Sequence, residues 1–71
     1  MNARATLTVL VNGQPQATQA RTLQEWVDAQ GVLPEGLATA VNGAFVPRNL
    51  RAQRVLAEGD TILTFQPIEG G

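Results

Sequence analysis

The sequence predicts an α+β fold in which one helix covers one face of a mixed sheet of about five strands. Three observations carry this prediction. Stretches of alternating apolar and polar residues recur along the chain, two Asn-Gly pairs separate neighbouring stretches, and one segment has the apolar spacing of a short helix. A chain of 71 residues that is 44% hydrophobic and carries a net charge of −1 has room for one small domain of this kind.

The N-terminal part of the chain predicts a hairpin. Residues 6–11 alternate and are rich in β-branched side chains, which is typical of a strand with one buried face. Asn12 and Gly13 follow, and both residues tolerate the positive φ of a two-residue hairpin turn. The returning strand, residues 14–20, is polar and contains Pro15, so we expect it at the edge of the sheet or at a strand start.

Residues 23–30 predict the single helix. Thr22 is a favourable N-cap, and Glu25 three residues later completes a capping box. Gly31 is the expected left-handed residue at the helix end. One apolar stripe follows from the i, i+3, i+4 spacing of Leu23, Trp26 and Val27. We therefore expect the large ring of Trp26 in the core.

The second half of the chain predicts three more strands. Residues 37–41 and 44–46 flank Asn42-Gly43 as a second hairpin, and residues 61–66 follow a tight turn at 58–60. We interpret both Asn-Gly pairs as turn chemistry alone. Residues 48–56 are predicted to be a loop with one irregular turn. This segment contains three arginines, Arg48, Arg51 and Arg54. We interpret them as a solvated face, and the alternative is a cationic rim that attracts acidic partners.

The resulting element order is β-β-α-β-β-β, and the last strand must return to lie beside the first. This order is that of the β-grasp fold. We expect residues 1–66 to form the β-grasp domain and residues 67–71 to form a flexible C-terminal tail, because Pro67 blocks further ladder pairing.

Composition excludes several kinds of function. The chain has no Cys and no His, which removes the usual ligands of transition metals, thiol chemistry and the commonest general base. We therefore predict no metal site, no bound cofactor and no catalytic residues. The arginines are scattered and the net charge is near zero, so we expect no nucleic-acid binding. No apolar run is long enough to span a bilayer and no signal peptide is recognisable, so we expect a cytoplasmic protein without a membrane anchor.

The sequence ends in Gly70-Gly71. Glycine loses the most backbone entropy on ordering, so two glycines are a poor choice for a fixed end. One interpretation is an ordinary frayed terminus. The other is that the terminal carboxylate is itself the reactive group.

Taken together, "VNG", "VNGAFVPR", "EGD" and the final "GDTILTFQPIEGG" resemble the ThiS/MoaD family of sulfur carriers, which are ubiquitin-like β-grasp proteins. The resemblance covers essentially the whole chain and favours the ThiS branch, which serves thiamin thiazole synthesis. Such chains often carry an aromatic residue shortly after "VPR", where this chain has Arg51.

The resemblance implies a co-substrate and not an enzyme. An E1-like adenylyltransferase (ThiF-like) would use ATP and Mg²⁺ to adenylate the carboxylate of Gly71. Sulfur from a persulfide donor would then give a thiocarboxylate that serves a thiazole synthase (ThiG-like). Gly70 would be needed for access to the partner's cleft, and Glu69 and Ile68 would contact the partner.

Leu63 and Phe65 alternate with Ile62 and Thr64, so they face the side of the sheet away from the helix. We interpret them as a candidate partner-binding patch, the alternative being a satellite cluster with Leu10 and Ala40. Two other functions stay open. One is a carrier for another sulfur product, such as the small subunit of molybdopterin synthase, and the other is a non-catalytic β-grasp binding module.

Overall fold

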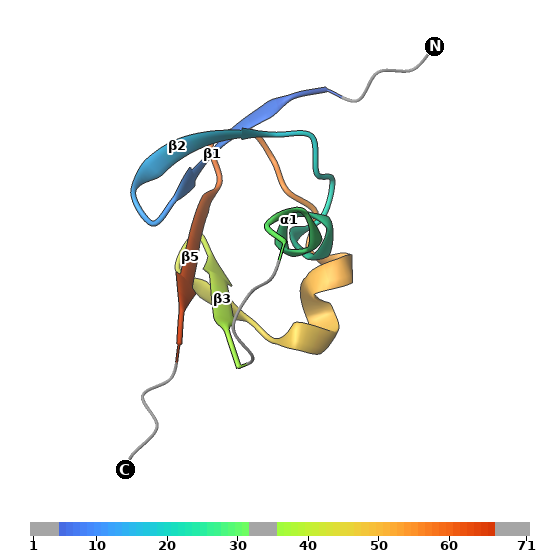
Figure 1. The fold of residues 1–71 in the computed structure, drawn as a ribbon, viewed down its shortest axis with the longest axis vertical. Helices are drawn as coiled ribbons and strands as arrows, with labels where there is room; N and C mark the ends of the chain where they lie inside the picture. The colour runs from blue at the N-terminus through green and yellow to red at the C-terminus, as the bar shows by residue number, and fades with distance from the viewer. Residues whose placement is uncertain (1–4, 32–35, 67–71) are drawn as a thin grey trace.

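A computed structural model of the chain describes residues 5–31 and 36–66 (Figure 1). Its elements, in chain order, are β1 (Leu7–Val11), β2 (Gln14–Thr18), α1 (Leu23–Ala29), β3 (Ala38–Val41), β4 (Ala44–Val46), the 3₁₀-helix η1 (Arg48–Gln53) and β5 (Thr61–Phe65). The strands form one sheet in the order β2-β1-β5-β3-β4. The predicted α+β class and the β-grasp arrangement are confirmed.

The last strand returns to lie beside the first, as predicted, and it occupies the centre of the sheet. β5 lies between β1, to which it is parallel, and β3, to which it is antiparallel. β2 pairs with β1 alone and forms one edge, where Pro15 lies opposite Leu10. β2 ends at Thr18, earlier than predicted, because the Thr18 hydroxyl accepts a hydrogen bond from the N–H of Ala20 and turns the chain out of the ladder.

Both Asn-Gly pairs form the predicted hairpin turns. The φ angles are 50° and 87° at Asn12 and Gly13, and 53° and 83° at Asn42 and Gly43. Two successive residues with positive φ define a type I′ turn, whose twist matches that of the flanking strands.

The helix begins as its sequence predicts. The Thr22 hydroxyl accepts a 3.2 Å hydrogen bond from the N–H of Glu25, and Gly31 follows the helix with φ 86°. Trp26 is 2% exposed, so its predicted place in the core is confirmed. The rest of the core comes from every layer of the domain and comprises Val9, Ala20, Leu23, Val41, Val46, Leu56 and Ile62.

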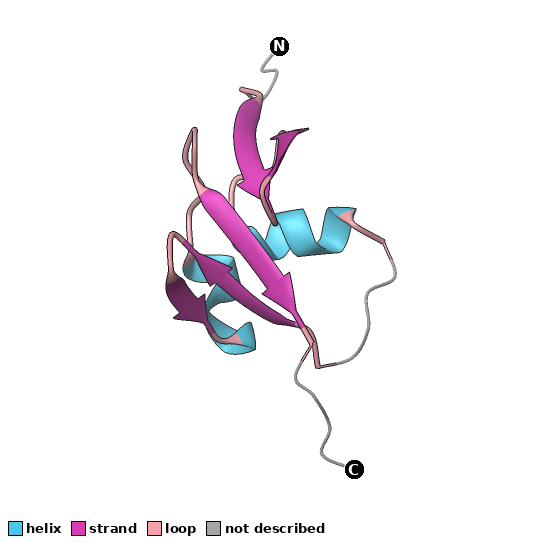
Figure 2. Ribbon diagram, turned by 90° about the vertical axis from the view of Figure 1, so that its left-hand side faces the viewer, coloured by secondary structure: helices cyan, strands magenta, loops and turns pink. Residues whose placement is uncertain are grey.

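The domain has two layers. Figure 2 shows the sheet in front of both helices, so that α1 and η1 cover the same face of the sheet. Within residues 5–31 and 36–66, no element covers the opposite face. The same ranges contain no helix of the length and apolar character that crossing a bilayer requires.

The segment after β4 corrects two predictions. Residues 48–56 were expected to be a loop with one irregular turn, but residues 48–53 form a 3₁₀-helix. The sequence favours a solvated face for Arg51, but the side chain is 6% exposed. Its Nε donates to the Thr39 hydroxyl at 3.0 Å and its Nη2 donates to the carbonyl of Leu37 at 2.6 Å. Burial, and secondarily the neighbouring Arg48, lowers the pKa of Arg51. The guanidinium stays buried because its hydrogen bonds replace those it would make to water.

Candidate functional site

An apolar patch occupies the sheet face that the helices leave open. Leu63 and Phe65 are 39% and 48% exposed, and Leu10 is similarly exposed on β1. Residues paired in register share a face, so the pairing of Leu63 with Ala40, and of Ala40 with Phe45, places these side chains in one row across β5, β3 and β4. This exposure favours the patch interpretation over a closed satellite cluster with Leu10 and Ala40. That a partner binds there stays a prediction.

The residues predicted to react or to enter a partner lie outside the described residues. These are Ile68, Glu69, Gly70 and Gly71. The chain that leads to them is described as far as residue 66, and the last strand residue before them is Phe65. The patch residues Leu63 and Phe65 therefore lie on the strand that precedes the predicted reactive segment.

Two asparagine side chains hold this strand, which corrects the interpretation of the Asn-Gly pairs as turn chemistry alone. Asn42 accepts a 2.9 Å hydrogen bond from the N–H of Thr61, at the start of β5. Asn12 accepts a 3.0 Å hydrogen bond from the N–H of Thr64 and donates one of 3.0 Å to the Thr64 hydroxyl. The sequence gives a signal for the turns, but no spacing rule connects Asn12 with a residue 52 positions away.

Asp60 stabilises the turn that immediately precedes β5. Its carboxylate accepts hydrogen bonds from the N–H of Ala57 at 2.8 Å and from Nδ2 of Asn42 at 2.9 Å. Its backbone carbonyl accepts from the N–H of Leu10 at 2.9 Å, which starts the parallel pairing with β1. This explains why an acidic residue that is only 8% exposed is tolerated: both carboxylate oxygens are hydrogen-bonded.

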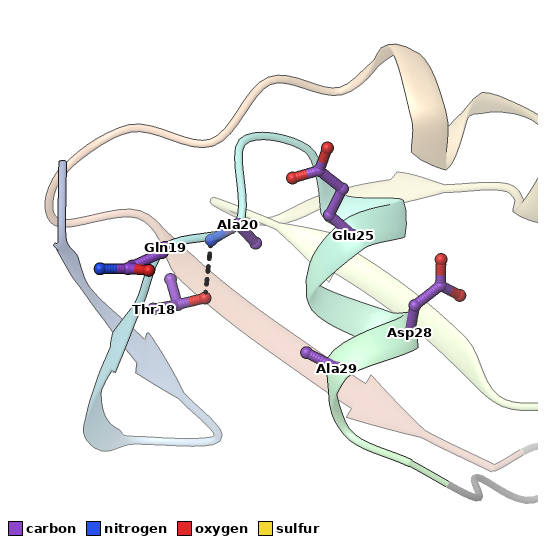
Figure 3. Close-up of a pocket in the computed structure, with 6 residues that line it drawn as sticks. All are labelled: Thr18, Gln19, Ala20, Glu25, Asp28 and Ala29. Atoms are coloured by element: carbon purple, nitrogen blue, oxygen red, sulfur yellow. Dashed lines mark hydrogen bonds between the residues drawn. The ribbon is translucent and has the colours of Figure 1, made fainter. Parts of the chain in front are cut away.

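A hollow of about 450 Å³ lies between the end of β2 and α1 (Figure 3). Its two carboxylates serve the local structure. Glu25 accepts a 2.8 Å hydrogen bond from the N–H of Arg21, and Asp28 accepts one of 2.9 Å from Nε2 of Gln24. None of the predicted site residues lines this hollow. In the part of the chain that the structure describes, no three metal-ligating side chains gather at one place.

The comparisons with known proteins agree with the β-grasp fold described above. The sequence matches the ThiS family over residues 5–71. It is 38% identical over 64 residues to the sulfur carrier protein ThiS of Escherichia coli (strain K12), a match that covers 89% of this chain and 97% of that protein. The crystal structure of the thiamine biosynthesis protein ThiS from Geobacter metallireducens superposes with a TM-score of 0.78, covering 92% of this chain and 100% of that one. At 22% identity, this structural similarity shows the fold alone.

Proposed function

Because this chain belongs to the ThiS family, we propose that it is a sulfur carrier protein of thiamine biosynthesis. The observation that carries the proposal is the match of 38% identity to a protein of that name, over nearly the full length of both chains. The family match also extends to Gly71, the residue that the proposed chemistry requires.

We propose the C-terminal carboxylate of Gly71 as the site that carries sulfur. A carboxylate is a poor electrophile, because neither oxygen departs readily as a leaving group. An E1-like, ThiF-like partner with ATP and Mg²⁺ would convert it to an acyl adenylate and release pyrophosphate. A persulfide sulfur would then attack the acyl carbon as AMP departs. This gives an acyl disulfide between Gly71 and the partner. A second thiol of the partner would then attack the partner's sulfur in that bond, forming a disulfide within the partner and leaving the thiocarboxylate on Gly71.

The composition supports a carrier in which the terminal carbon is the reactive centre. With no Cys, the chain has no thiol on which to hold sulfur, and with no His it lacks the commonest general base. ATP, Mg²⁺ and the thiols therefore belong to partner enzymes in this proposal. Gly70 has no Cβ, so a narrow cleft can close around its backbone, and Glu69 and Ile68 are the residues next to it that would contact the cleft. A ThiG-like thiazole synthase would be the final acceptor of the sulfur.

Intact-mass measurement tests the proposal. The chain is incubated with ATP, Mg²⁺, the E1-like enzyme of the same organism and a persulfide donor. We expect a mass gain equal to the difference between sulfur and oxygen. A variant lacking Gly71 is the matched control, and we expect it to gain no sulfur while its melting temperature stays that of the unmodified chain.

Each result that contradicts the proposal points to a different alternative function or site. No mass gain in the complete reaction would favour a non-catalytic binding module. A gain in the variant without Gly71 would place the sulfur elsewhere. Copurification with the large subunit of molybdopterin synthase, in place of a thiazole synthase, would assign the carrier to a different sulfur pathway.

A further inference from the structure

Asn12 continues the β1 side of the sheet after the strand itself has ended. β1 stops at Val11, and its register with β5 covers only Leu10 with Thr61 and Val11 with Ile62. Beyond that point the N–H of Asn12 donates to the carbonyl of Ile62 at 2.9 Å. The N–H of Thr64, two residues further along β5, then donates to Oδ1 of Asn12. A side-chain amide thus takes the place of the next strand carbonyl.

This contact lies at the end of β5 nearest to the predicted reactive segment. On its other side β5 pairs with β3, with Thr39 opposite Thr64 and Ala38 opposite Phe65. The C-terminal end of β5 is therefore held on one side by β3 and on the other by the side chain of Asn12. Removing the Asn12 amide would leave the β1 side of Thr64 without this partner, so that the end of β5 would be held from the β3 side alone.

We propose that Asn12 is a positioning residue: it fixes the end of β5, and with it the point on the sheet from which the C-terminal residues start toward the activating enzyme. This inference rests on the proposed carrier function. In that function, the open face of the sheet and the reactive carboxylate would have to contact the same partner at the same time. The C-terminal residues follow the end of β5, so the Asn12 contact holds the point on the sheet from which they start. Misplacement of a reacting group by about 1 Å is enough to lower a rate substantially.

The second hairpin provides a matched control. Asn42 has the same turn position, nearly the same φ (53° against 50°) and the same kind of hydrogen bond to a β5 N–H, but it acts at Thr61. Its Nδ2 also donates to the buried carboxylate of Asp60, so Asn42→Gly is the more severe test of a general effect on folding. Glycine accepts positive φ, so Asn12→Gly and Asn42→Gly both preserve their turns while removing the side-chain bonds. Asn12→Asp is the conservative variant. Aspartate tolerates this φ and can accept from both the N–H and the hydroxyl of Thr64.

The experiment measures steady-state adenylation of each full-length variant by the E1-like enzyme of the same organism, with hydrogen exchange of the Thr64 amide in the free carrier. For Asn12→Gly we expect kcat to fall about tenfold and KM to change much less, because every side chain of the patch is retained and only the strand end that carries Phe65 is loosened. Thr64 should lose protection. Asn42→Gly should keep the kcat of the unmodified chain, and Asn12→Asp should recover most of it. Melting temperatures are measured for all variants, so that a loss of folded protein is recognised.

Four results would overturn the inference. An Asn12→Gly variant with unchanged kcat, or with unchanged Thr64 protection, shows that the side chain does not position the strand end. Equal losses of kcat in Asn12→Gly and Asn42→Gly show a general effect on folding. If the unmodified chain itself is not adenylated, the proposed function fails, and the inference fails with it.

Discussion

The indole Nε1 of Trp26 donates a 2.7 Å hydrogen bond to Oε1 of Gln16, and so joins the only α-helix of the described chain to the edge strand β2. β2 needs such a connection because it pairs with β1 alone. The ring also fills the core between helix and sheet, where it is buried among aliphatic side chains. One residue therefore combines apolar burial with a directed polar contact.

We predict that Trp26→Phe lowers the free energy of unfolding by about 1–2 kcal/mol, through the lost hydrogen bond and the smaller ring. In a domain of this size, that corresponds to a melting temperature lower by roughly 4–16 °C. Thermal unfolding followed by circular dichroism measures it. A double-mutant cycle with Gln16→Ala isolates the bond, and we expect a coupling energy of about 0.5–1.5 kcal/mol. Strictly additive effects would show that the bond contributes nothing to stability.

A second prediction concerns Arg51, which anchors η1 to the start of β3 through Leu37 and Thr39. Arg51→Ala removes the donor to the Leu37 carbonyl and leaves a cavity. We therefore expect a loss of about 2 kcal/mol or more in the free energy of unfolding, measured by urea denaturation. Arg48→Ala is the control: Arg48 is exposed in the same 3₁₀-helix, and its removal should change stability by less than about 0.5 kcal/mol.

Arg51→Met separates packing from hydrogen bonding, since methionine keeps much of the volume of the arginine stem. We expect it to be more stable than Arg51→Ala and less stable than the unmodified chain. A methionine variant as stable as the unmodified chain would mean that the hydrogen bonds to Leu37 and Thr39 only offset the cost of burying the charge.

Local signals made most of the fold predictable. The Asn-Gly pairs fix two hairpins, the Thr22 cap fixes the helix start, and Pro15 identifies the edge strand, because each acts through backbone geometry within a few residues. The place of β5 beside β1 followed from the need of one short helix to cover one sheet. Burial of Trp26 followed from its spacing with Leu23.

The contacts that the sequence did not reveal are long-range and polar. Arg51 has the composition of a surface residue. Its burial depends on a carbonyl and a hydroxyl that lie 14 and 12 residues away along the chain. Asn12 has an evident role in its turn, which conceals its second role at Thr64. In both cases the side chain satisfies backbone groups whose positions are set only once the sheet has formed.

A third prediction tests the helix cap. Thr22→Ala removes the acceptor for the N–H of Glu25, and we expect a loss of about 1 kcal/mol in the free energy of unfolding. Thr22→Ser keeps the hydroxyl and should stay within a few tenths of a kcal/mol of the unmodified chain. Equal losses in both variants would assign the effect to the methyl group and not to the cap.

The last prediction concerns Phe65, which is 48% exposed on the face that no described element covers. If this ring anchors a partner, Phe65→Ala should weaken binding to the E1-like enzyme by about tenfold in Kd, because a truncated aromatic anchor costs more than about 1 kcal/mol. The melting temperature should change little, since the ring lies outside the core cluster. Calorimetric titration measures the Kd, and thermal unfolding measures the stability of the same samples.

The control for Phe65 is Val55, which is 63% exposed but lies beside the helix cap, where it forms a single β-bridge with Thr22. Val55→Ala truncates an exposed apolar side chain away from the open sheet face, so it should leave the Kd unchanged. A fall in melting temperature for Phe65→Ala as large as that for Trp26→Phe would make the ring part of the structural core. An unchanged Kd would remove Phe65 from the partner-binding patch and leave Leu63, the next exposed apolar side chain on the same face of β5, to be tested in the same way.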